Sequence, residues 1–80
     1  MAIITNSWTL ITNNSGLIVQ KFGNENLYIS YTDGPEPVDG VDSVFIVKSS
    51  KIETFEGVDG KSLWLKASVE DLHITYEILV

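Results

Sequence analysis

Apolar residues recur at every second position in short blocks along the chain, and residues such as Gly, Asn, Asp and Pro separate the blocks. A period of two puts alternate side chains on opposite faces of a β-strand, so each block predicts a strand with one buried face. No window of helical length keeps a 3.6-residue period, and we expect no helix longer than about two turns. Seven blocks fit the strand pattern, over residues 8–12, 17–22, 27–32, 43–47, 51–55, 62–67 and 72–80.

Residues typical of turns predict how these strands connect. Two short turns, over residues 13–16 and 23–26, join the first three blocks and indicate an antiparallel meander. The pair Asp59-Gly60 is the strongest hairpin dipeptide in the chain, and residues 33–40, with two prolines, form the one long loop.

The last block alternates most regularly, and its inward face is expected to consist of Leu72, Ile74, Tyr76, Ile78 and Val80. Together the blocks predict a single all-β domain over residues 1–80, a small antiparallel β-sandwich or barrel of about seven to eight strands.

The length and charge of the chain narrow its possible partners. A domain of 80 residues has a small core, and without cysteine it has no disulfide, so self-association is the favoured source of added stability. Five lysines and no arginine stand against eleven carboxylates, for a formal charge of −6. That balance disfavours both nucleic acids and anionic membrane surfaces as partners, and no apolar run approaches the roughly 20 residues of a membrane span.

Catalytic residues are scarce. His73 is the one candidate base at neutral pH, and it lies on the predicted outer face of the last strand, near Glu77. Glu53 and Glu56 could form a carboxylate pair, but surface solubility explains them as well. We therefore expect a surface or interface role for His73, no enzymatic activity and no cofactor.

The long loop carries carboxylates at a spacing of three residues, which could converge on a calcium ion. They do not match the ligand pattern of an EF-hand, and a solvated acidic loop is the preferred interpretation. The four calcium candidates are Asp33, Glu36, Asp39 and Asp42.

Two aromatic residues are candidates for binding a partner. Trp64 shares one face of its strand with Lys66, and the opposite face is wholly aliphatic, which suits a core better. Tyr28 lies on the corresponding face of its own strand. A half-exposed tryptophan or tyrosine is typical of interfaces and sugar platforms, although both rings could instead cover the edge of the sheet.

The order of the elements resembles that of small β-rich structural proteins of tailed bacteriophages. The similar segments are Trp8 to Asn14, Asp33 to Pro37, Gly57 to Ala67 and Leu72 to Glu77. The resemblance implies a virion component, made in the host cytoplasm: a capsid decoration protein, or a subunit of a head fibre or tail attachment. It also implies a symmetric homo-oligomer, often a trimer, bound to capsid or tail proteins, and it supplies no catalytic residues.

Both ends of the chain are apolar, whereas free termini are usually polar, so we expect one or both to pack against a neighbouring subunit. The complete set of candidate partner-binding residues is Trp64, Lys66, Tyr28, His73, Ile3, Ile4, Leu79 and Val80.

Two other functions stay open from the sequence. The first alternative is a small carbohydrate-binding module, with Trp64 and Tyr28 as stacking platforms and the acidic loop beside them. The second is a cupin-like enzyme, for which a single histidine is too few, because such metal sites normally need two or more.

Overall fold

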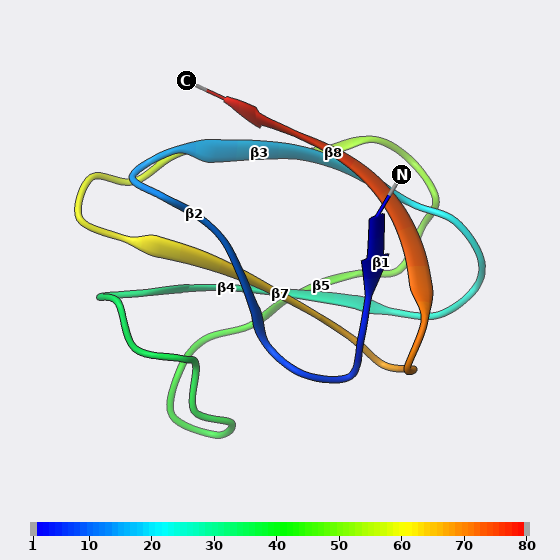
Figure 1. Ribbon diagram of the computed structural model, residues 1–80, viewed down its shortest axis with the longest axis horizontal. Coiled ribbons are helices and arrows are strands. Elements are labelled where there is room, and N and C mark those ends of the chain that lie inside the picture. Colours follow the sequence, from blue (N-terminus) through cyan, green and yellow to red (C-terminus); the bar gives the residue numbers. More distant parts are fainter. Residues whose placement is uncertain (1, 80) are drawn as a thin grey trace.

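Two four-stranded antiparallel sheets face each other in the computed structural model, which describes residues 2–79 (Figure 1). The first sheet consists, in spatial order, of β1 (Ala2–Ile4), β8 (Leu72–Leu79), β3 (Gly16–Lys21) and β6 (Glu53–Phe55). The second consists of β2 (Thr9–Asn13), β7 (Ser62–Ala67), β4 (Leu27–Thr32) and β5 (Phe45–Val47). The all-β sandwich predicted from the sequence is confirmed, and the described residues contain no helix that could cross a membrane.

Every connection except β4–β5 crosses from one sheet to the other. Eight strands in this order form the double Greek key known as a jelly roll. The meander prediction is wrong, because β2, β3 and β4 alternate between the sheets and none of them pairs with the next. Asp59-Gly60 likewise joins strands of different sheets. Turn residues reverse the chain, but they do not determine whether the next strand pairs with the last one or faces it across a core.

The core between the sheets is aliphatic. The inward positions of β3, β4, β7 and β8 follow the period of two seen in the sequence, which places the large side chains in two facing layers. The buried apolar residues are Ile4, Leu17, Val19, Leu27, Ile29, Val47, Leu63, Leu65, Ala67, Leu72 and Ile74. Lys21 continues the inward face of β3 and is fully buried, with its ammonium donating to the Gly23 carbonyl at 2.9 Å.

The inward face of β8 is buried over only half its length. Leu72 and Ile74 are buried, but Tyr76 is 43% and Ile78 37% exposed. The reason is that β1 is short and pairs with residues 72–74 alone, so no described strand covers the rest of β8 on that side. Val80, predicted on the same face, lies outside the described residues.

A close backbone contact joins the start of β3 to the segment after β6. A Cβ atom added to Gly16 would lie 2.5 Å from the Phe55 carbonyl oxygen and 2.7 Å from the Gly57 nitrogen. Both obstructing atoms belong to the backbone, which cannot move aside as a flexible side chain can. This contact holds β6 against β3 at the edge of the first sheet.

Gly16→Ala is expected to lower the free energy of unfolding by about 1–3 kcal/mol, because the added methyl group must displace backbone. Chemical denaturation measures the change. Asn24→Ala, at an exposed turn, serves as the control and should stay within about 0.5 kcal/mol of the parent protein. Equal stability of the Gly16 variant and the control would contradict the close contact.

Candidate functional site

The outer face of the second sheet holds a lysine between two aromatic rings. Tyr28 and Lys66 are cross-strand partners on β4 and β7. The Lys66 ammonium lies 4.8 Å from the ring centroid of Trp8 and 5.7 Å from that of Tyr28, and it pairs with Asp39 at 3.4 Å. The ring faces of Trp8 and Tyr28 are therefore engaged by a cation of the protein's own chain. The Trp8 indole N–H is buried and meets no acceptor among the described residues.

Trp64 lies on the same outer face, as the alternation along β7 predicts, and is half-buried. Its indole N–H donates to the Thr32 hydroxyl at 2.9 Å, and that hydroxyl donates to the Pro35 carbonyl at 2.6 Å. Thr32 thus ties the long loop to the sheet, and Trp64 holds the Thr32 hydroxyl in place. The structure brings Trp64, Lys66 and Tyr28 onto one face, and their partner-binding role stays a prediction.

The other candidate contact residues lie on the first sheet. Ile3 and His73 are cross-strand partners on β1 and β8, and both are exposed. Ile4 points the other way and is only 4% exposed, so it belongs to the protein's own core and offers no surface to a partner. Leu79 is half-buried, and Val80 lies outside the described residues.

The four carboxylates of the long loop do not converge. Asp33 pairs with Lys61, Asp39 pairs with Lys66, and Asp42 accepts a hydrogen bond from the Val38 amide at 2.7 Å. In residues 2–79 no group of three or more histidine, aspartate or glutamate side chains is placed to hold a metal ion. Asp33, Asp39 and Asp42 therefore fasten and shape the loop.

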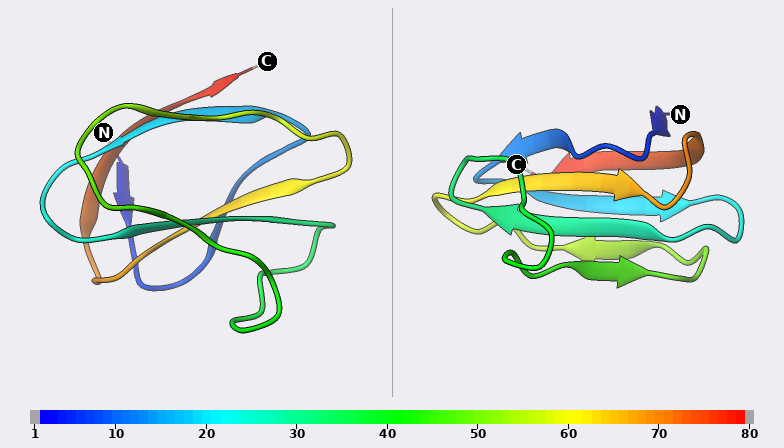
Figure 2. Two further views of the ribbon diagram at one scale, coloured as in Figure 1. Left: turned by 180° about the vertical axis from the view of Figure 1, so that it is seen from behind. Right: turned by 90° about the horizontal axis from the view of Figure 1, so that it is seen from below.

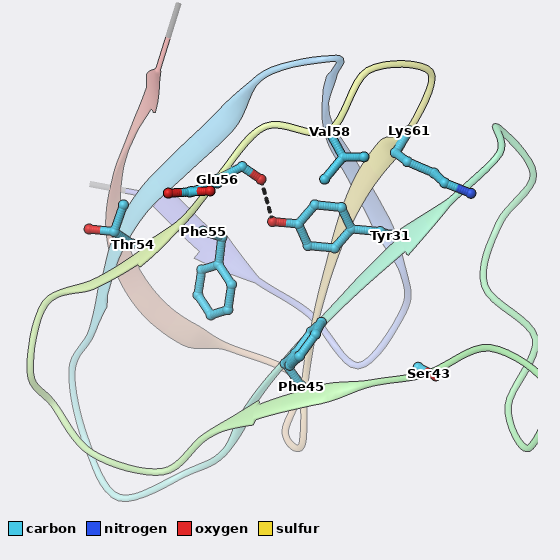
Figure 3. A pocket seen from close by; sticks show the side chains of 8 residues that line it. All are labelled: Tyr31, Ser43, Phe45, Thr54, Phe55, Glu56, Val58 and Lys61. Carbon is cyan, nitrogen blue, oxygen red and sulfur yellow. Dashed lines mark hydrogen bonds between the residues drawn. The ribbon is translucent and has the colours of Figure 1, made fainter.

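An aromatic cleft of about 440 Å³ opens between the two sheets, on the side where they end in β5 and β6 (Figure 3). Each of these strands pairs on one side only, β5 with β4 and β6 with β3. The lining residues are Tyr31, Ser43, Phe45, Thr54, Phe55, Glu56, Val58 and Lys61.

Three rings form the floor and walls of this aromatic cleft. The Phe45 ring centroid lies 6.2 Å from that of Tyr31, nearly edge to face, and 6.2 Å from that of Phe55. Phe45 remains 54% exposed, so a large part of its ring is open to a ligand or a partner. The Tyr31 hydroxyl donates to the Glu56 carbonyl at 2.6 Å and joins β4 to the segment after β6 (Figure 3). Burial raises the pKa of Tyr31, and the nearby Glu56 carboxylate raises it further.

Sequence reasoning missed the aromatic cleft. The period of two puts Tyr31 on the same face of its strand as Leu27 and Ile29, but it gives no sign that Phe45 and Phe55 approach each other from strands of different sheets. The chemistry of the cleft suits an apolar group. Its lining offers hydroxyls, one carboxylate and one ammonium, but no histidine or cysteine to serve a covalent reaction.

Comparison of the chain with protein-family models, with curated proteins and with solved structures gives no match in any of the three. The functional conclusion therefore rests on the geometry described above and on the resemblance noted from the sequence.

Lys66→Met keeps the aliphatic stem of the side chain but removes the charge that faces Trp8, Tyr28 and Asp39. The free energy of unfolding should fall by about 1 kcal/mol, as expected for a partly buried cation–π contact, and tryptophan fluorescence should change. Lys48→Met, at an exposed loop position, is the matched control and should change neither quantity. If the two variants are equally stable, the lysine does not hold the rings.

Tyr31→Phe should remove a pH dependence of stability. The folded protein holds the Tyr31 proton more tightly than the unfolded chain, so this contribution is complete below the unfolded pKa of about 10. It is lost as the pH rises through the higher pKa of the folded state. Denaturation from about pH 8 to about pH 11 should show a shallower decline for the variant than for the parent. A steeper decline of stability for the variant would mean that folding lowers the pKa of Tyr31, and it would contradict this assignment.

Proposed function

We propose that this protein is a non-enzymatic structural subunit of a tailed bacteriophage virion, which associates with copies of itself and binds capsid or tail proteins. The observation that carries the proposal is the aromatic cleft left open between the unpaired edges of β5 and β6. An aromatic surface between two free strand edges is typical of an interface completed by another protein.

The balance of buried and exposed apolar side chains supports association. Among the described residues, eleven hydrophobic side chains are buried, whereas twelve large ones are exposed. Among them, Phe45 and Val58 lie together at the aromatic cleft, 54% and 46% exposed, and contiguous apolar surface of this kind is typical of binding sites. The small core gives such a chain a further reason to gain stability from a partner.

The chain crosses from one sheet to the other on both sides of the sandwich, through the β1–β2 connection and through the β5–β6 connection, residues 48–52. On the β1–β2 side the Ala67 amide bonds to the Thr5 carbonyl at 2.9 Å. On the β5–β6 side the aromatic cleft lies between the two strand edges and leaves Phe45 54% exposed. This exposed aromatic surface supports binding on the β5–β6 side.

The fold itself leaves several functions open, since jelly rolls include viral capsid domains, lectins and cupins. The resemblance to small phage structural proteins favours the first of these classes. The carbohydrate-binding alternative has weaker support, because its two expected platforms are occupied: the Lys66 ammonium lies over the Tyr28 ring, and the Trp64 indole N–H holds the Thr32 hydroxyl.

Light scattering of the purified protein is expected to give a discrete closed oligomer, with a trimer favoured, down to low micromolar concentration. A monomer at all concentrations would contradict the proposal. A glycan array is the companion measurement, since binding of a sugar by the monomer would favour the carbohydrate-binding alternative.

A further inference from the structure

The outer face of the second sheet already contains a site where aromatic rings and a carboxylate surround a cation. The Lys66 ammonium lies 4.8 Å from the ring centroid of Trp8 and 5.7 Å from that of Tyr28. The Asp39 carboxylate pairs with it at 3.4 Å. Ring faces carry partial negative charge, so they attract an ammonium ion. The aromatic cleft combines the same kinds of groups, and within residues 2–79 no ammonium lies over its rings.

The rings of the aromatic cleft have faces that are open to another molecule. The plane of the Phe45 ring is set at 77° to that of Tyr31 and at 52° to that of Phe55, so neither pair is stacked in parallel. Phe45 is 54% exposed, and the other two rings are half-buried. β5 and β6 are the outermost strands at one end of the sandwich (Figure 2), so a group can reach the rings directly from solvent.

A carboxylate gives the aromatic cleft a negative charge. Glu56 lines the cleft, and its side chain takes part in no ion pair or hydrogen bond with the rest of the described chain. Burial and the Glu56 charge together raise the pKa of Tyr31, which shows that the field of the carboxylate reaches the rings. Lys61 also lines the cleft, but it pairs with Asp33 and its side chain extends away from the rings (Figure 3).

The charges around the cleft leave Glu56 uncompensated. Two carboxylates and two lysines close to β6 in the sequence match in number, and the Lys61–Asp33 pair is neutral. The matched residues are Glu53, Asp59, Lys48 and Lys51. The chain as a whole has a formal charge of −6, which acts in the same direction. A cation is therefore the charged group that this side of the molecule attracts.

We propose that the aromatic cleft binds a basic side chain, a lysine or an arginine, of a partner protein. The aliphatic stem of such a side chain suits the apolar lining, while its charged end contacts the ring faces and the Glu56 carboxylate. A cleft of about 440 Å³ has room for one side chain of this size. The inference rests on the binding of capsid or tail proteins proposed above, and it names the chemical group that the cleft accepts from them.

A second copy of this chain is a poor source of that side chain. The chain has no arginine, and three of its five lysines are buried or already paired. Carboxylates outnumber lysines by eleven to five, so two copies repel each other, whereas a partner with a basic surface is attracted. The occupant is therefore assigned to a different protein.

Titration of the isotope-labelled protein with Nα-acetyl-lysine N-methylamide, followed by NMR, tests the site. The matched control is the norleucine compound, which has the same aliphatic chain without the ammonium. The lysine probe should shift the ring signals of Tyr31, Phe45 and Phe55 in a saturable way, with a millimolar dissociation constant. It should bind about 5-fold more tightly than the control, the gain typical of a cation–π contact. The arginine compound and its neutral citrulline analogue form a second pair.

Two substitutions separate the contributions of the ring and the charge. Phe45→Leu removes the most exposed ring but keeps an apolar side chain, and Glu56→Gln removes the charge but keeps the shape. Each should weaken binding of the lysine probe by about 3-fold or more. Glu56→Gln should leave binding of the norleucine control unchanged. Glu70→Gln removes the same charge at the exposed β7–β8 turn, which contributes no residue to the cleft, and should behave like the parent protein.

The outcomes separate this site from the oligomeric state. Equal binding of the cation and its neutral control in both pairs, or no saturable shift with either cation, would overturn the inference even if the protein forms a discrete oligomer. A monomer that prefers the cationic probes would contradict self-association and leave the site in place.

Discussion

The structure depends on burying the aliphatic faces of two short sheets against each other within 80 residues. Residues 2–79 form no helix that could cover a sheet, so each sheet must be the cover for the other. The chain meets this constraint by changing sheets at nearly every turn, which places successive strands opposite each other across the core. The turn at Asn14 shows how these crossings are held: its amide donates to the Lys61 carbonyl and its side chain accepts from the Gly60 amide.

The same constraint explains where binding surfaces lie. Aliphatic residues fill the centre, and the large rings lie outside it. Trp8 and Tyr28 flank Lys66 on the outer face of the second sheet, and Tyr31, Phe45 and Phe55 form the aromatic cleft. The chain crosses between the sheets on both sides of the sandwich. On the β5–β6 side the aromatic cleft leaves Phe45 54% exposed, and this apolar surface is one that a second molecule can bury.

The sequence predicted the faces of strands better than their partners. Alternation along β7 placed Leu63 and Leu65 inside and Trp64 outside, because a side chain's face depends only on the strand it belongs to. Pairing depends on the whole fold, so turn residues could not reveal that consecutive strands lie in different sheets. Tyr76 is exposed because β1 pairs only with residues 72–74 of β8. Phe45 approaches Phe55 because the edge strands that carry them, β5 and β6, lie on the same side of the sandwich. Spacing also suggested that the loop carboxylates might share an ion, whereas lysines distant in sequence bind two of them separately.

Amide hydrogen exchange measured over a range of protein concentrations tests most directly whether the β5–β6 side is the side that associates. As concentration rises, protection should increase in β5 and in residues 54–58, while residues 75–79 of β8, which pair with β3 but not with β1, should exchange at a constant rate. Protection that increases along β8 instead, or at neither segment, would contradict the assignment of the open side as the binding side.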